Sequence, residues 1–353
     1  MALQVTPMLS GGDKTLQYIV LGAEWGSREP NLAVYPFFGT SIGPKYSDPA
    51  SLPSAGGDGL GVDVSPDGKH IATASIESPY LNAYSFSSGG FGQKLSNPST
   101  SVLYSAQRVK FSPNGDAIAV SLSGNSDRFY VYGFSSGGFG ARYSSPSTLP
   151  AGSPMDIAFS RDGDFLAFSH ASSPYLTIYP FSASNGIGAK LSDPSILPNS
   201  RGFGVSFSKG GRVAVGHRSG DGISVYTIES GGVGSKFSSP ATPLNGDEAF
   251  VDFSPDGDAI AIGDDSHPYV HAYEWSDSSG FGAKYSNPTN VPGGACQGVS
   301  FSRDGKSLAF SADDSTNVYV YPWSASSGFG AKISGPDVLP ASGSVHDIAF
   351  GEV

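Results

Sequence analysis

Acidic side chains gather in two neighbouring connections of this chain. Asp247 and Glu248 precede an apolar run, and Asp264, Asp265 and His267 follow it. Carboxylate oxygens at this density are ligands that Ca²⁺ prefers, and a metal ion there could assist hydrolysis. However, the spacing matches no metal-binding motif, and a histidine before a proline is also an ordinary turn residue. We therefore predict no metal and no other cofactor, and keep Asp247, Glu248, Asp264 and Asp265 as weak metal candidates.

Charged and aromatic residues also recur in the connections along the rest of the chain. The segments that flank these connections are constant in type, whereas the connections themselves vary. Variable polar loops on a rigid frame are a common place for binding, although a plain solvated rim would look the same. The candidate binding residues are Glu24, Trp25, Arg28, Glu29, Arg108, Asp127, Arg128, His170, Arg201, His217, Arg218, Asp221, Asp264, Asp265, His267, Asp313 and Asp314.

Nucleophilic and phosphate-binding motifs are absent from the sequence. There is no G-x-S-x-G element and no G-x-x-x-x-G-K-[ST] loop. Cys296 is the only cysteine, so no disulfide can form within the chain. We expect Cys296 to be a small buried apolar residue without a catalytic histidine partner. No catalytic residue is assigned.

The elements that must position these loops are repeats. A tyrosine recurs every 47 to 49 residues, with apolar runs and glycine turns at fixed distances from it. A repeat of this length is typical of a propeller, in which each copy forms one blade. The repeated tyrosines are Tyr35, Tyr84, Tyr132, Tyr179, Tyr226, Tyr273 and Tyr321. They could form a ligand platform, but seven equivalent copies favour packing between blades, with each hydroxyl bonded to a fixed partner.

One copy shows how a blade is built. Residues 155–160, 165–168, 175–181 and 189–192 are short apolar or aromatic runs separated by turn residues, which predicts four antiparallel strands. The Gly-Ile-Gly element at residues 186–188 and its Gly-Phe-Gly equivalents are interpreted as turns. Helical periodicity is absent from the repeats.

The two ends of the chain complement each other. Residues 345–351 form a first strand with no second strand after it, and residues 16–22 form a second strand with no first strand before it. Paired, they would complete a blade and leave no open edge. We predict an all-β, single seven-bladed propeller with four strands per blade. The blades are expected at residues 10–53 with 341–353, 54–101, 102–150, 151–198, 199–244, 245–292 and 293–340.

A basic residue also recurs in each expected outer strand. These seven residues could grip an acidic or symmetric partner. We favour long side chains whose stems cover apolar surface and whose charges deter edge pairing. They are Lys45, Lys94, Arg142, Lys190, Lys236, Lys284 and Lys332.

Composition excludes several classes of partner. The formal net charge is −11, and Lys and Arg form no cluster, which argues against nucleic acid. No run of 18 apolar residues occurs, so we expect no membrane insertion. The first residues lack the pattern of a signal peptide, which favours a cytoplasmic location unless the protein is carried in a virion.

The segment F-S-P-N-G-D-A-I-A at residues 111–119, and its relatives at Phe253 and Phe301, resemble the F-S-P-D-G repeats of WD-repeat-like and TolB-like propellers. The Gly-His pair and Trp-Asp dipeptide of true WD repeats are missing in register. The segment G-F-G-A-K-Y-S-N-P at residues 280–288 is similar to repeats of propellers from tailed bacteriophages. That resemblance implies a tail- or capsid-associated virion protein that binds other virion proteins or a host-surface glycan or protein.

Two functions of different classes follow. The leading hypothesis is a non-catalytic structural or binding propeller of a phage particle, because near-uniform blades leave no strongly deviant sector for an active site. The alternative is a soluble propeller enzyme with a metal-assisted, lactonase-like hydrolase site on the loop face, near Asp264, Asp265, His267 and Asp313.

Overall fold

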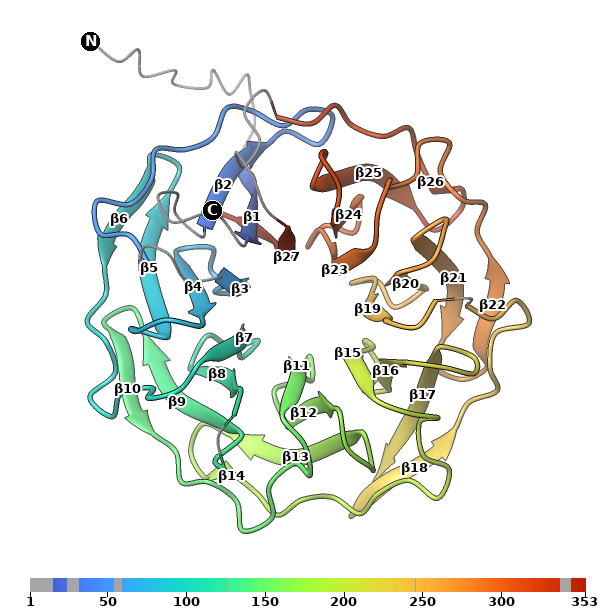
Figure 1. Ribbon diagram of the computed structural model, residues 1–353, viewed down its shortest axis with the longest axis horizontal. Helices are drawn as coiled ribbons and strands as arrows, with labels where there is room; N and C mark the ends of the chain where they lie inside the picture. Colours follow the sequence, from blue (N-terminus) through green and yellow to red (C-terminus); the bar gives the residue numbers. More distant parts are fainter. Residues whose placement is uncertain (1–14, 24–31, 54–58, 125, 245, 337–343) are drawn as a thin grey trace.

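The computed structural model describes residues 15–23, 32–53, 59–124, 126–244, 246–336 and 344–353. These residues form strands, turns and irregular segments without a helix, and hence without a helix able to cross a membrane. The strands build seven sheets arranged as a ring around a central axis (Figure 1). The predicted all-β, seven-bladed propeller is confirmed.

Each blade runs outward from the axis through up to four antiparallel strands. The innermost strands are β3 (Gly59–Val64), β7 (Ala106–Phe111), β11 (Pro154–Phe159), β15 (Gly202–Phe207), β19 (Phe250–Phe253), β23 (Cys296–Phe301) and β27 (Val345–Glu352). The second strands are β1 (Gln17–Ala23), β4 (His70–Ser75), β8 (Ala117–Leu122), β12 (Phe165–His170), β16 (Val213–His217), β20 (Ala259–Gly263) and β24 (Ser307–Ala312).

The outer half of each blade carries the repeated tyrosine. The third strands are β2 (Leu32–Phe37), β5 (Leu81–Ser87), β9 (Phe129–Ser135), β13 (Leu176–Ser182), β17 (Ile223–Glu229), β21 (Val270–Ser276) and β25 (Val318–Ser324). The outermost strands are β6 (Gly90–Lys94), β10 (Gly138–Arg142), β14 (Gly186–Ile187), β18 (Gly232–Lys236), β22 (Gly280–Lys284) and β26 (Gly328–Phe329). In the closing blade this place is taken by residues 42–46, which bond to β2 through Gly43 and Tyr46.

The ring closes through its two ends, as predicted. β27 pairs antiparallel with β1 from Gln17 opposite Glu352 to Ala23 opposite Val345. Leu16 and Val353 extend the ladder with two further backbone hydrogen bonds of 2.8 and 2.9 Å. The closing blade therefore takes its innermost strand from β27 and its next two strands from β1 and β2.

The predicted position of the fourth strand is wrong by a few residues. In the blade of residues 154–187 the strand was expected at 189–192, but β14 is Gly186–Ile187. The Gly-Phe-Gly elements therefore open the outer strands and are not only turns. Gly138 has a φ of 103° at the start of β10, which lets the chain reverse directly into the strand.

The repeated tyrosines are core residues, as the sequence predicts. Their side chains are at most 1% exposed. The hydroxyl of Tyr179 donates to the carbonyl of Thr148 at 2.8 Å, and that of Tyr273 donates to Thr242 at 2.7 Å. Each bond ties a third strand to the loop that enters its own blade. The hydroxyl of Tyr84 is buried and has no partner among the described residues.

Loss of the Tyr179 hydroxyl should destabilise the protein more than loss of the Tyr84 hydroxyl. Tyr179→Phe removes a bonded hydroxyl and leaves the Thr148 carbonyl unpaired, so we expect the free energy of unfolding to fall by about 1 kcal/mol. Tyr84→Phe removes a buried hydroxyl that has no partner in the described part of the chain, and should leave that free energy unchanged or raise it. Urea unfolding of both variants measures the two effects. Equal losses would contradict the assigned bonding.

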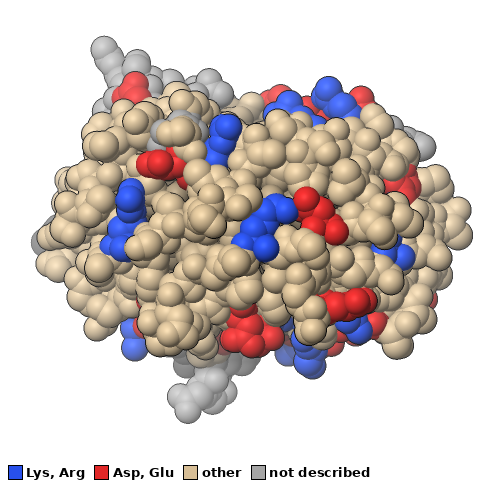
Figure 2. Space-filling model, turned by 90° about the horizontal axis from the view of Figure 1, so that it is seen from below, with Lys and Arg blue, Asp and Glu red and all other residues tan. Residues whose placement is uncertain are grey.

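Four of the recurring basic residues lie opposite the tyrosines on the outer strands: Lys94, Arg142, Lys236 and Lys284. Several are already engaged: the Lys236 ammonium lies 3.0 Å from Asp221, and the Lys332 ammonium lies 3.9 Å from the centre of the Tyr319 ring. On the side shown in Figure 2, Lys and Arg lie apart from one another, with Asp and Glu between them. This arrangement fits stems that cover apolar surface better than a basic ring that grips one partner.

Candidate active site in the central channel

The first strands of the blades place polar side chains on the central axis. Because side chains alternate along a strand, two levels of each first strand face the channel. One level contains Asp63 and Lys110 at equivalent positions of β3 and β7, and also Asp252 of β19. The other contains Asp156 of β11 and Asp347 of β27. Four carboxylates and one ammonium thus line the channel, in strands whose other residues are mostly apolar or small.

Each of these carboxylates is held by a backbone amide of the following blade. Asp63 accepts from Phe111 at 2.7 Å, Asp156 from Val205 at 3.0 Å, Asp252 from Phe301 at 2.9 Å, and Asp347 from Val62 at 3.1 Å. These bonds link neighbouring first strands and fix the direction of each carboxylate. The aspartates therefore stabilise contacts between blades as well as lining the cavity.

Burial acts on the protonation of three of the carboxylates. It raises the pKa of Asp156 to about 6, although Lys110 and Arg108 act in the opposite direction. Burial also raises the pKa values of Asp63 and Asp252 above their ordinary range. Lys110 and the amide of Phe111 lower the pKa of Asp63, and the amide of Phe301 lowers that of Asp252, but burial outweighs them. A carboxylate that titrates near neutrality can both accept and return a proton.

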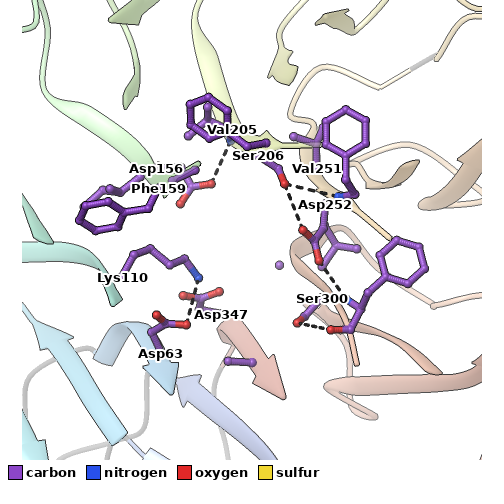
Figure 3. Close-up of a pocket in the computed structure, with 18 of the residues that line it drawn as sticks. Asp63, Lys110, Asp156, Phe159, Val205, Ser206, Val251, Asp252, Ser300 and Asp347 are labelled. Carbon is purple, nitrogen blue, oxygen red and sulfur yellow. Dashed lines mark hydrogen bonds and ion pairs between the residues drawn. The ribbon is translucent and has the colours of Figure 1, made fainter. Parts of the chain in front are cut away.

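Lys110 is the cation at the centre of this group. Its ammonium lies 3.8 Å from Asp63 and points into the cavity between Asp156 on one side and Asp63 and Asp347 on the other (Figure 3). Burial alone would lower the pKa of Lys110, but the carboxylates of Asp347, Asp63 and Asp156 outweigh it and raise that pKa. Lys110 is consequently a permanent positive charge in the channel.

The channel holds a cavity of about 350 Å³ between these side chains (Figure 3). Arg108 also lines it: its guanidinium lies 5.7 Å from the centre of the Phe250 ring and donates to the carbonyl of His346 at 3.4 Å. Phe250 belongs to a blade three further along the ring, so this contact crosses the channel. Arg108 therefore narrows the channel at the level of Asp156.

Two further arginines brace the level of the first hairpin turns. Arg161 donates to the carbonyls of Phe253 at 2.9 Å and Ser254 at 3.1 Å. Arg303 donates to Ser65 at 2.8 Å. Each guanidinium reaches the second blade along the ring, so both span the channel mouth at this end. The cavity thus lies between two levels of cross-channel contacts.

The candidate loop residues from the sequence do not gather around this cavity, with the exception of Arg108. Glu24, Trp25, Arg28 and Glu29 lie outside the described residues. Three others are buried inside blades: His170, His217 and Asp264 are 0% exposed. His170 and His217 end second strands, and Asp264 directly follows one. Each faces a polar partner on a third strand: His170 faces Thr177 at 2.9 Å, His217 faces Ser224 at 2.9 Å, and Asp264 faces His271 at 3.1 Å.

The weak metal candidates are bound to other protein groups. Arg218 lies 3.9 Å from Asp247 and 3.2 Å from Glu248, and the amide of Asp247 donates to Asp265 at 2.6 Å. Among the described residues, no three His, Cys, Asp or Glu side chains come together as a metal site would require. The donors of this region form protein contacts.

The remaining candidates hold loops. Asp314 accepts from the Tyr319 hydroxyl at 2.7 Å, Asp313 accepts from Ser344 at 2.6 Å, and Asp127 accepts from the Tyr130 hydroxyl at 2.8 Å. Arg128 bonds to Ser153, and Asp221 pairs with Lys236. Arg201 contacts Met155 and the ring of Phe203, and His267 contacts the ring of Tyr269. Cys296 is 1% exposed, as expected, and burial raises the pKa of its thiol.

The channel residues Asp63, Lys110, Asp156, Asp252 and Asp347 were missed in the sequence. A signal was present, because each is a charged residue inside a first strand whose other members are mostly apolar. Equivalent positions in the other copies carry glycine, alanine or serine, apart from Arg108 and Phe250. Comparison of the first strands alone would have drawn attention to them.

Solved structures resemble the whole ring. A proposed 6-phosphogluconolactonase from Bacteroides fragilis is 12% identical, with a TM-score of 0.71 over 96% of this chain and 98% of that one. A second, from Bacteroides uniformis, is 14% identical, with a TM-score of 0.69 over 96% and 100%. The periplasmic gluconolactonase of Pseudomonas aeruginosa is 17% identical, with a TM-score of 0.66 over 95% and 99%. No family model and no curated protein sequence matches the chain.

At these identities the likeness shows the fold. The names of these structures nevertheless contradict the prediction of a non-catalytic virion protein, since all three describe lactone-hydrolysing enzymes. That prediction is wrong on this comparison. It erred because it treated the blades as uniform, whereas their first strands differ at the channel.

Proposed function

We propose that this protein is a hydrolase that opens a lactone, a cyclic ester, in the central cavity. The observation that carries the proposal is the pair formed by Asp156, whose pKa is raised to about 6, and the permanently charged Lys110, both facing one cavity of about 350 Å³. A base and a fixed cation that face one partly open cavity are groups that ester hydrolysis can use. The names of the structural neighbours support the same reaction class.

In this proposal Asp156 is the general base. Its Oδ2 is held by the Val205 amide, and no described residue donates to Oδ1, which is left to bind a water molecule. The ionised carboxylate takes a proton from that water as the water oxygen attacks the lactone carbonyl carbon. The new carbon–oxygen bond converts the carbonyl oxygen to an oxyanion, and the Lys110 ammonium stabilises that negative charge.

Collapse of this intermediate opens the ring. The bond between the carbonyl carbon and the ring oxygen breaks, and the ring oxygen leaves as an alkoxide that takes the proton back from Asp156. The product is a hydroxy acid, and Asp156 is ionised again. No oxidant, reductant or cofactor is consumed, and one water is added. Asp63 and Asp347 position Lys110 and keep it charged.

The test is the rate of gluconolactone opening by the purified protein in a pH-stat at constant pH. We expect a saturable rate that is proportional to protein concentration and exceeds spontaneous hydrolysis. Heat-denatured protein is the control. A rate equal to the spontaneous one for gluconolactone and for other five- and six-membered lactones would overturn the proposal.

The pH dependence of the reaction should report Asp156. Only the ionised carboxylate can accept a proton, and its pKa is raised to about 6. We therefore expect kcat/KM to rise about tenfold per pH unit below about pH 6 and to level off above it. Initial rates in overlapping buffers, corrected for spontaneous opening, measure the profile. A profile that is flat through pH 6 would contradict the role of Asp156.

A further inference from the structure

Building on the proposed function, we infer that the substrate is an uncharged lactone, without a phosphate or carboxylate substituent. The structure assigns this specificity through the balance of charge around the cavity. Four aspartates surround the single lysine, and three arginines that line the cavity are already bound to protein groups. A neutral, hydroxylated ring fits such a lining, whereas an added anion would find carboxylates.

Lys110 is surrounded by carboxylates. It is the only lysine that lines the cavity among the described residues, and the carboxylates of Asp63, Asp156 and Asp347 all act on it. In the proposed reaction the ammonium serves the carbonyl oxygen. It therefore has no charge left over for a second anionic group on the same substrate.

The three arginines that line the cavity are bound to other protein groups. Arg161 and Arg303 direct their guanidinium groups at backbone carbonyls of the hairpin turns two blades away. Arg108 stacks across the channel on Phe250 and donates to His346. A phosphate that recruited one of these guanidinium groups would leave buried carbonyl oxygens unpaired, which costs more than a surface contact returns.

The channel aspartates would repel an anionic substituent on the substrate. A phosphate monoester carries a charge of about −1.5 to −2 at neutral pH. Beside Asp63, Asp156 and Asp252, whose pKa values burial has already raised, it would favour their protonated forms. Asp156 would then lose its function as a base. The net charge of −11 also opposes the approach of an anion.

The experiment compares gluconolactone with 6-phosphogluconolactone, which differ only in the phosphate, on the same wild-type protein. We expect kcat/KM to be at least about tenfold higher for gluconolactone. Equal or faster opening of 6-phosphogluconolactone would overturn this inference and leave the proposed hydrolase standing. If the protein opened neither compound nor any other lactone, the proposed function itself would fail.

Two further measurements test the cause of the preference. Asp252→Asn removes one negative charge, so it should shift the ratio of the two kcat/KM values several-fold towards 6-phosphogluconolactone. Asp164→Asn removes the same charge from an exposed turn and should leave the ratio unchanged. In the wild type, raising salt from about 0.02 to about 0.5 M should increase kcat/KM for the phosphorylated lactone only. An unchanged ratio in Asp252→Asn together with a flat salt response would contradict the inference.

Discussion

Replacing Asp156 with asparagine should reduce kcat/KM for lactone opening by about 10²–10⁴-fold, the range expected for loss of a general base. Asparagine has nearly the same shape, and its amide oxygen can still accept from the Val205 amide, as Oδ2 of Asp156 does at 3.0 Å. It cannot take a proton from water. The free energy of unfolding should therefore change far less than the rate, and stopped-flow assays beside urea unfolding measure both.

Asp164→Asn in the same blade is the matched control, because Asp164 is exposed in the hairpin turn outside the cavity. It should keep the wild-type rate. The residual activity of Asp156→Asn should also lose the rise through about pH 6, since the titrating group is gone. A variant that retained the wild-type rate and pH profile would show that Asp156 is only a contact between blades.

Replacing Lys110 with methionine should be the most destabilising single change in the channel. Methionine fills a similar volume but leaves four carboxylates without their central cation. Removing one partner of a fully buried charge pair costs about 3–5 kcal/mol in the free energy of unfolding. Because the side chain of Lys110 is 27% exposed, we expect a smaller loss of about 1–3 kcal/mol. Lactone opening should be lost with it, because the oxyanion has no counter-charge. Chemical unfolding at about pH 8 measures the loss, with Lys306→Met, an exposed lysine of a hairpin turn, as the control.

The loss in Lys110→Met should depend on pH in a defined direction. Lys110 lowers the pKa values of Asp63, Asp156 and Asp252, so its removal raises them further in the folded protein. A carboxyl whose folded pKa exceeds its unfolded pKa stabilises the fold as it takes up its proton. The deficit should therefore shrink as the pH falls from about 8 to about 5. A deficit that stayed constant or grew in acid would contradict a charge-based role.

The fold could be predicted because its determinants are local and repeated. The spacing of the tyrosines gave the number of blades, and the incomplete first and last strands indicated that β1 and β27 share a sheet, which their register confirms. The outer strands were less well placed. A glycine with positive φ, such as Gly138, opens the strand directly, and sequence alone does not separate that conformation from a turn.

The site was harder to predict because its residues are far apart in sequence. Asp63, Asp156 and Asp347 meet only because the ring brings seven first strands to one axis. In sequence each is a single charge in an apolar run, while the charged loops are richer in conspicuous residues. His170, His217 and Asp264 look like surface groups, yet each pairs with a polar residue across two strands.

The channel aspartates explain how one set of residues can serve structure and chemistry together. One carboxylate oxygen of each aspartate accepts a hydrogen bond from a backbone amide of the next blade. This bond orients the carboxylate and stabilises the contact between the two blades. Rigid positioning by such bonds is what catalysis needs from its scaffold. The blades can therefore remain near-uniform in their outer strands while the inner strands diverge.

The location of a bound ligand is the most direct test of the account. A crystal structure of the protein with gluconolactam, in which a ring N–H replaces the ester oxygen and slows ring opening, would show where the ring binds. We predict that it lies in the central cavity, with its carbonyl oxygen towards Lys110 and its carbonyl carbon beside Asp156. A lactam bound instead at the outer loops, in a protein that opens gluconolactone, would contradict the central claim.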